Sequence, residues 1–273
     1  MNRRVASIVL NGGLFLIAAM TVVPVFWMVS ASVMAPGEAS TVPLRFIPVR
    51  LTFEHYLALV DRLHMGRYFL NSFIIASAVT LISLLFNSMA GYAFAKFRFP
   101  GKDRLFRLLL SGMVVPAQVT MLPLFLMLKT FGLVNTYAGA IVPGLASIFG
   151  IFLIRQFAGS IPDSLIEAAR IDGASDFKIY RSVVLPLCRP ILSTLALFTF
   201  MGTWNDFMWP LIIMTDDARY TLPVAIANLK GEHLLDLELM MAGSVVTILP
   251  VLILFLAFQR HYIRGIMVGG VKG

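Results

Sequence analysis

The chain has 273 residues, of which 59% are hydrophobic and 13% charged, and its mean hydropathy is +0.86. These values exclude a soluble globular domain, because apolar stretches long enough to cross a bilayer, about 20 residues each, recur along the chain. The formal net charge of +8 requires no nucleic acid, since an uneven distribution of Lys and Arg across a membrane, together with anionic lipid, accounts for it.

Six apolar runs predict six transmembrane helices and a single all-α integral membrane domain over residues 1–273. The runs are Val5–Gly37, Tyr68–Ala95, Leu108–Leu128, Thr130–Ile154, Pro190–Thr215 and Leu239–Gln259. The first is far longer than the roughly 7–15 residues of a signal-peptide core, so we expect it to be a retained span.

Residues 38–67 form the first predicted outer loop. Part of it is expected to be an amphipathic helix, because apolar residues recur there at helical spacing, namely Phe53, Tyr56, Leu57, Val60 and His64. Such a helix would lie along the membrane surface or against a neighbouring subunit.

Small residues four apart in the second and fourth runs predict close helix contacts, because packing rather than burial holds helices together in lipid. These pairs are Gly91/Ala95, Ala140/Gly144 and Ala146/Gly150. Residues Lys129–Thr136, with Gly132 and Asn135, predict a tight turn between the third and fourth runs. Several runs also contain prolines, each of which removes a helix hydrogen bond and suits either a moving pathway or an ordinary membrane helix.

A polar segment, residues 158–189, separates the fourth and fifth runs and is expected to form two short helices joined by a bend. Ser164 and Glu167 have capping-box spacing, Gly173 suits a left-handed helix end, and Ser175 suits the cap of the second helix. Pro186 is expected to end that helix. Small side chains flanked by acids on the first helix leave room for another protein; the alternative is a helix packed on its own chain.

The fifth run carries Trp204, Asn205, Asp206 and Trp209. An acid costs about 2.5–3.5 kcal/mol at the bilayer centre, so Asp206 should face protein or water. Two interpretations stay open. In one, these residues form the mouth of a polar pathway that binds hydroxyl-rich ligands such as sugars. In the other, Asp206 ends a helix within an interfacial belt anchored by the two tryptophans.

The C-terminal tail is basic and rich in glycine, and either makes an adaptable cytoplasmic contact through Gly269, Gly270 and Lys272 or is disordered. The sequence has no Gly-x-x-x-x-Gly-Lys-Ser/Thr phosphate loop, no His/Cys cluster with metal-binding spacing and no nucleophile with a partner base. We therefore expect no catalytic residue, metal or cofactor in this chain, which is not an enzyme by itself. The single cysteine, Cys188, is expected to be a packing residue.

The polar segment resembles a known loop. Glu167-Ala168-Ala169, Asp172-Gly173-Ala174 and Leu185-Pro186 match the EAA loop of membrane subunits of ATP-binding-cassette (ABC) importers, which docks on the ATPase. Other motifs extend the resemblance along the chain: Asn71-Ser72, Ala90-Gly91-Tyr92-Ala93-Phe94, Phe99-Pro100-Gly101, Asn135-Thr136-Tyr137, Trp204-Asn205-Asp206 and the Gly-Gly-Val-Lys-Gly end. The chain is similar to maltose-type carbohydrate permeases of bacterial ABC importers, and most similar to the shorter, six-span partner of the usual pair. Tyr180 departs mildly, because many relatives have Phe or Trp there.

The resemblance implies the type I ABC importer permease fold in the bacterial cytoplasmic (inner) membrane. It also implies a second permease subunit, a dimer of cytoplasmic ABC ATPases that binds ATP and Mg, and an extracytoplasmic sugar-binding protein. Closure of the ATPases would move the helix around Glu167–Gly173, so that the pathway opens alternately to the two sides. The docking residues would be Glu167, Ala168, Ala169, Asp172, Gly173, Ala174, Leu185 and Pro186.

Orientation follows from the cations. Two Lys or Arg lie at the N-terminus, five in the second loop, five in and beside the 158–189 loop and three in the tail, which is 15 of the 22 in the chain. Cytoplasmic segments carry such an excess, so both termini and the 158–189 loop are expected to be cytoplasmic.

Two alternatives remain. The cargo of such an importer could be another solute, such as glycerol phosphate or a peptide. A protein of another class, an ion-coupled secondary sugar carrier, usually shows paired intramembrane ionisable residues or inverted repeats. Here Asp206 is the only acid inside a predicted span.

Overall fold

The computed structural model describes residues 3–61, 64–232 and 236–270, and the regular structure in these ranges is entirely helical. Three helices are long and apolar enough to cross a membrane: Leu10–Ala31 within α1 (Arg3–Ala31), all of α3 (Met65–Lys96), and Leu237–Ala257 within α14 (Leu237–Gly270). Three bent helix pairs pass the same test, and six spans result if each pair is one span. The all-α membrane fold predicted from the sequence is confirmed.

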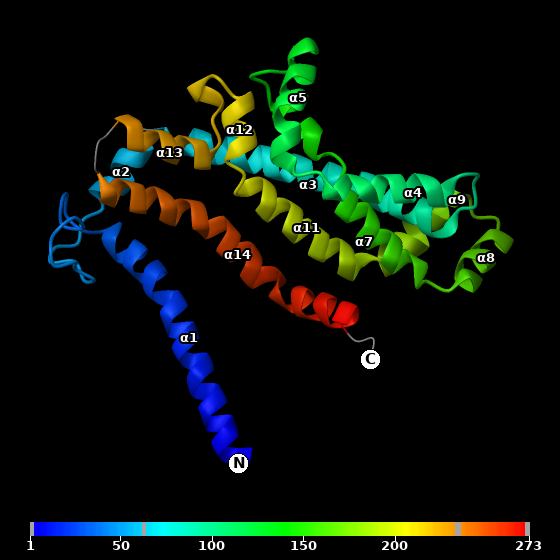
Figure 1. Cartoon of the computed structure of the whole chain (residues 1–273), viewed down its shortest axis with the longest axis horizontal. Coiled ribbons are helices and arrows are strands. Elements are labelled where there is room, and N and C mark those ends of the chain that lie inside the picture. The colour runs from blue at the N-terminus through cyan, green and yellow to red at the C-terminus, as the bar shows by residue number, and fades with distance from the viewer. Residues whose placement is uncertain (1–2, 62–63, 233–235, 271–273) are drawn as a thin grey trace. The chain divides into compact units, whose positions relative to one another are not determined.

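The bends were not predicted. The sharpest, 104°, separates α4 (Lys102–Ser111) and the short turn that follows it from α5 (Ala117–Thr130), which projects away from α4 in Figure 1. Val115 and Pro116 both have extended backbones at this point. A residue before proline avoids the α-helical region, and proline has no N–H to continue the ladder, so the helix stops and restarts in a new direction.

A second bend, of 42°, lies between α6 (Tyr137–Ile141) with its following turn and α7 (Ile148–Gly159). Side chains satisfy the backbone where this helix is broken. Ser147 N donates to Asn87 Oδ1 at 2.9 Å, and Ser147 Oγ accepts from Gly150 N at 2.9 Å. Asn87 is fully buried and also donates to Ser83 Oγ at 2.8 Å. The break therefore has polar partners within the protein, as a broken helix in a membrane requires.

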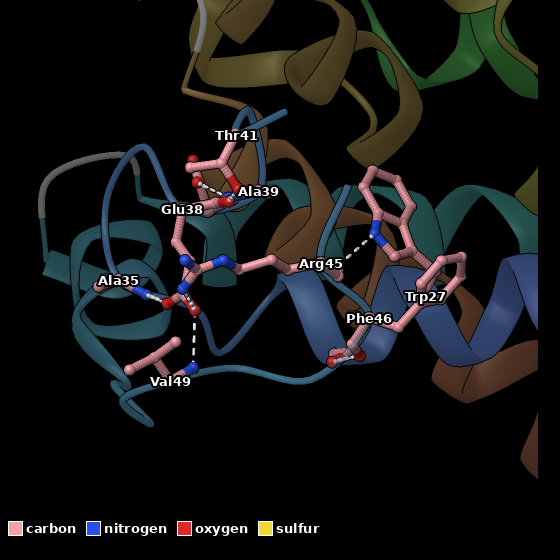
Figure 2. Close-up of polar contacts among 10 residues, drawn as sticks. Trp27, Ala35, Glu38, Ala39, Thr41, Arg45, Phe46 and Val49 are labelled. Carbon is pink, nitrogen blue, oxygen red and sulfur yellow. Dashed lines mark hydrogen bonds and ion pairs between the residues drawn. The ribbon is translucent and has the colours of Figure 1, made fainter. Parts of the chain in front are cut away.

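The chain divides into two compact units, residues 1–67 with 225–250, and residues 68–224 with 251–273. In the first unit a loop after α1 folds around Glu38, which is only 9% exposed (Figure 2). Its carboxylate accepts from Val49 N at 2.6 Å and Ala35 N at 3.2 Å. Glu238, at the start of α14, accepts from Ala39 N at 2.8 Å. Two buried carboxylates thus order the beginning of the predicted outer loop.

The amphipathic helix predicted in this loop is present as α2 (Glu54–Asp61). Its buried residues are His55 and Leu59, whereas Leu57 and Val60 of the predicted apolar face are exposed. That face is therefore available to something outside the chain, either a membrane surface or a neighbouring subunit.

In the second unit α3, α7 and α11 (Arg189–Trp204) lie side by side, as Figure 1 shows. A Cβ atom at Gly91 would lie 2.6 Å from Ile154 Cβ, and one at Gly144 would lie 2.7 Å from Val79 Cγ1. The close contacts predicted at these glycines are confirmed. The tight turn is also confirmed, since Gly132 and Asn135 have φ values of 67° and 58° and the Thr136 side chain caps α6.

Candidate functional site

The 158–189 loop contains two helices, α8 (Asp163–Ile171) and α9 (Asp176–Ile179), as predicted. Gly173 has φ +76°, and its N–H donates to the carbonyl of Arg170. Ser175 caps α9 by accepting from Lys178 N. The predicted capping box is wrong: α8 begins at Asp163 after Pro162, no side chain caps it, and Ser164 lies inside the helix. Pro162 has an extended backbone, which sets the helix start one residue ahead of Ser164.

The second helix does not end at Pro186, which corrects another prediction. α9 continues through a π-helical turn, Tyr180–Val184, into α10 (Leu185–Leu187), and the chain bends by 79° at Cys188 before α11. A π turn has i→i+5 hydrogen bonds, so the backbone register changes here without ending the helix. Leu185 is half-buried against the core and Pro186 is exposed.

The outward face of α8 is small and accessible. Glu167, Ala168, Asp172 and Gly173 are exposed, and Ala169 and Ala174 are half-buried. Glu167 also lines a cavity of about 880 Å³ that α8 shares with the segment after α3. The structure therefore brings four of the predicted docking residues of α8 and the bend after it to the surface, while Ala169 and Ala174 also pack against the core.

Two further residues extend this region and were not predicted. Ile171 is 87% exposed at the end of α8, and Phe177 is 64% exposed on α9. Both add apolar surface beside the accessible residues of the loop. In the sequence they are two of several apolar residues of the loop, and no local signal separates them from the buried Ile166 and Ile179.

The opposite face of the loop is packed firmly on the helical bundle. Ile166 of α8 and Ile179 of α9 are buried in one core with Ile154 of α7 and Leu195 of α11. Cys188 belongs to this core and is 1% exposed, in line with the packing role expected for it. Burial of this kind contributes about 1.5–3 kcal/mol per large side chain, so the loop is seated on the bundle as a rigid element.

Aromatic contacts tie the π-helical turn after α9 to the end of α3. The buried Tyr180 exchanges a hydrogen bond with Ser88 Oγ at 2.7 Å and stacks on Tyr92, with ring centroids 5.9 Å apart. The hydroxyl that distinguishes Tyr180 from the Phe or Trp of the resembling family therefore has a partner in α3.

Lys96, the last residue of α3, fixes the entrance to the loop. Its Nζ donates to the carbonyl of Ile161 at 2.5 Å and to Asp163 Oδ1 at 2.6 Å, and lies 3.4 Å from the carbonyl of Gly159. This hydrogen bond and the Lys96 charge lower the pKa of Asp163. The side chain of Lys96 is only 9% exposed. In the sequence it is simply one of several cations after a span.

The tryptophan-rich motif spans a helix break. α11 ends at Trp204, and Asp206 Oδ1 accepts from Trp209 N at 3.4 Å at the start of α12 (Met208–Ile213). Trp204 is 1% and Trp209 7% exposed, and Trp209 Nε1 donates to the carbonyl of Gly139. Both indoles are thus internal in this chain, while Asn205 is exposed and Asp206 half-buried. The burial of both tryptophans disfavours a belt that faces lipid.

A polar cluster next to this motif joins three segments distant in sequence. Asn71, 2% exposed, donates to the carbonyls of Ala218 at 3.0 Å and Tyr220 at 2.9 Å, and accepts from Tyr137 Oη at 2.7 Å. The Asn135 side chain accepts from the backbone of residues 215 and 216. Residues of the motifs Asn71-Ser72 and Asn135-Thr136-Tyr137 therefore hold the segment after α12 against α3 and α6.

The predicted C-terminal contact is described only in part. α14 continues to Gly270, so Gly269 and Gly270 lie at its helical end. Lys272 lies outside the described residues.

Comparisons with known proteins agree with this geometry. Residues 87–268 match the family described as "Binding-protein-dependent transport system inner membrane component". The arabinooligosaccharides transport system permease protein AraQ of Halalkalibacterium halodurans is 36% identical over 272 residues, covering 98% of each chain. The sn-glycerol-3-phosphate transport system permease protein UgpE of Salmonella typhi is 31% identical, over 97% of this chain and 98% of its own.

A solved structure has the same fold. One chain of a bacterial ABC transporter involved in the import of the acidic polysaccharide alginate superposes with a TM-score of 0.83 and 26% identity, over 94% of this chain and 96% of that chain. The family resemblance inferred from the short motifs is thus confirmed by similarity over nearly the whole chain.

Proposed function

The chain belongs to the family of inner membrane components of binding-protein-dependent transport systems, and from this premise we propose that it is a permease subunit of an ATP-driven sugar importer. It forms half of a translocation pathway with a second permease subunit. Hydrolysis of ATP belongs to a pair of cytoplasmic ABC ATPases, and an extracytoplasmic binding protein delivers the sugar. The permease changes conformation because the ATPases, which are separate chains, close and move it.

One observation supports the proposal that this chain transmits motion of the ATPases to its membrane helices. α8 is accessible on one face and packed on the helical bundle with the other. Ala168 and Gly173 are exposed, whereas Ile166 is buried in the core that also contains Ile154 and Leu195. A partner that displaces α8 therefore displaces α7 and α11 with it, because close-packed cores transmit strain instead of absorbing it. A loosely held loop would dissipate the same displacement.

The cation distribution supports a cytoplasmic position for both termini and for the 158–189 loop, because 15 of the 22 Lys and Arg would lie on that side. The ATPases, with their ATP and Mg, would then meet α8 from the cytoplasm. Asp206, with Asn205, Trp204 and Trp209, would lie along the pathway.

A sugar is the proposed cargo, and glycerol phosphate is the alternative with a specific observation in its favour. AraQ is named for arabinooligosaccharides and the alginate transporter for a polysaccharide, while UgpE is named for glycerol phosphate. The ligand that co-purifies with the cognate binding protein decides between them: a phosphorylated polyol overturns the sugar assignment, and an oligosaccharide supports it.

The docking role is tested by crosslinking. In a Cys188→Ala background, Ala168→Cys and Ala169→Cys are expected to crosslink to a nucleotide-hydrolysing subunit in native vesicles, and the matched control Ala117→Cys, exposed on α5, is not. A chain that crosslinks to no ATPase from either position of α8 lacks the proposed coupling surface. A chain that takes up sugar without any ATPase would be a secondary carrier.

A further inference from the structure

A basic groove lies at the start of α4, next to the cavity that Glu167 lines. The two share Phe97, Arg98, Phe99 and Lys102. Its volume is about 560 Å³, and it is lined by the turn after α3 and the first turns of α4. Four of the lining residues are cations and one is an acid: Arg98, Lys102, Arg104, Arg107 and Asp103. The local charge is therefore strongly positive.

The chain neutralises the charges in the groove only in part: the charge of Arg98 acts on Asp163, whereas Arg104 and Arg107 have no acidic partner among the described residues. Asp103 lies 3.9 Å from Arg155, whose guanidinium stands over the Phe106 ring at 3.7 Å, so the acid already has a cation of its own. Lys102 Nζ donates to the carbonyl of Phe97 at 2.9 Å. In the described part of the chain, the three arginines of the groove have no hydrogen bond or ion pair with any acid, and all three are exposed. A ligand for them must be an anion.

Apolar side chains accompany the arginines on the same helix. Leu105 is 50% and Leu108 70% exposed, while Phe106 anchors α4 in the core at 4% exposure. Residues three apart share one face of a helix, so Arg104 and Arg107 form a basic stripe beside the stripe of the two leucines. The exposed apolar surface continues past the end of α4, where Val114 is 83% exposed.

We infer that this groove, formed by Arg98, Arg104 and Arg107, binds the phosphate headgroup of an anionic phospholipid, with the acyl chains lying along Leu105 and Leu108. A helix that presents cations next to leucines is suited to the boundary between headgroups and acyl chains. The inference needs only the membrane location of the chain, and is independent of the cargo and of the ATPase.

Two other occupants supply anions but do not explain the leucines. Free phosphate would use the arginines and leave the apolar stripe exposed to water. An acidic surface of a partner ATPase would require a protein to cover that stripe, and its removal would loosen the complex.

The experiment compares lipid retention by the complete transporter after purification from nanodiscs that contain equal phosphatidylglycerol and phosphatidylcholine. Bound lipid is counted by native mass spectrometry. The variants are Arg98→Gln, Arg104→Gln and Arg107→Gln, singly and combined, with a combined Arg→Lys variant that keeps the charges. Arg189→Gln is the matched control, because Arg189 is exposed at the start of α11 and does not line the groove.

Each Arg→Gln change is expected to reduce retained phosphatidylglycerol about fivefold, and the control to leave it unchanged. The Lys variant should retain most of the binding, and added salt should weaken binding by the wild type. If the combined Gln variant does not assemble, the single variants and the Lys variant still decide. Retention unaffected by the Gln changes overturns the inference. So does displacement of the lipid by millimolar inorganic phosphate, or loss of the ATPase from the complex with lipid retention intact.

Discussion

Lys96 and Asp163, 67 positions apart, are joined by a hydrogen bond of 2.6 Å between Nζ and Oδ1. The same ammonium group also bonds the carbonyl of Ile161. The end of α3 therefore holds the beginning of α8, the helix proposed to receive motion from the ATPases.

Replacing Lys96 by Met should loosen the entrance to the 158–189 loop. The Lys96 ammonium group is buried and its hydrogen bond to the carbonyl of Ile161 is charge-assisted. Such a bond contributes about 1.5–3 kcal/mol, so opening of the loop should become at least tenfold more frequent. Hydrogen exchange of residues 158–172, followed by mass spectrometry, measures this directly. Lys178→Met, an exposed lysine on α9, is the control, and equal exchange in the two variants would refute the role of Lys96.

Gly173 should be replaceable only by residues that accept a positive φ. At φ +76°, asparagine is tolerated, whereas most other residues pay about 1–2 kcal/mol and proline cannot adopt the conformation. Gly173→Asn should therefore transport like the wild type. Gly173→Pro should insert normally, hydrolyse ATP and fail to transport.

Glu167→Lys gives a second test of the same surface through charge, without strain. Parallel assays of ATP hydrolysis and sugar uptake in proteoliposomes separate coupling from assembly. Wild-type uptake in both Gly173→Pro and Glu167→Lys would show that this bend does not transmit motion.

Local features of the fold were predictable from the sequence, because each depends on residues close together in the chain. The apolar runs indicated the spans, Gly173 its left-handed conformation and Ser175 its cap. The resemblance of the 158–189 motif to a docking loop was likewise contained in one short segment.

Features that depend on distant partners were not predictable. The role of Lys96 requires α8, and that of Asn71 requires carbonyls 147 and 149 positions away. The π turn before Pro186 and the bend at Pro116 show the same limit. A proline in the sequence indicates that one helix hydrogen bond is missing, but it does not indicate whether the helix continues through a π turn or bends. The failed capping box at Ser164 arose because Pro162 sets the start of the helix.

Gly91→Ala should destabilise the bundle although alanine favours helices. The added Cβ would lie 2.6 Å from Ile154 Cβ and 3.0 Å from the backbone nitrogen of Arg155. Overpacking of this kind costs about 1–3 kcal/mol, which lowers the midpoint of thermal unfolding in detergent. Gly202→Ala is the control, because nothing lies within 4 Å of a Cβ there and helix propensity alone should raise the midpoint. Equal midpoints for the two variants would contradict the close contact.

Asn71→Ala should release the segment after α12. The change leaves the carbonyls of Ala218 and Tyr220 and the hydroxyl of Tyr137 without this partner, at about 1–3 kcal/mol for each group left unsatisfied. Proteolysis within residues 214–222 should accelerate accordingly. Tyr137→Phe removes only one of the three bonds and should have a smaller effect, while Asn11→Ala, an exposed asparagine of α1, should have none. A larger effect of Tyr137→Phe than of Asn71→Ala would remove Asn71 from the centre of the cluster.

Asp206 has two candidate roles that a pair of substitutions separates. As a cap of α12 it needs only an oxygen that accepts from Trp209 N, which asparagine supplies equally well; alanine loses about 1 kcal/mol. As a pathway residue it needs its charge, because hydrogen bonds to an ionised group are roughly twice as strong as neutral ones. We expect Asp206→Asn and Asp206→Ala both to reduce sugar uptake at least tenfold, with assembly of the Asn variant unchanged. Asp216→Asn, which alters another capping aspartate, should transport normally. Wild-type uptake by Asp206→Asn, together with impaired assembly of Asp206→Ala, would make Asp206 a helix cap and remove it from the pathway.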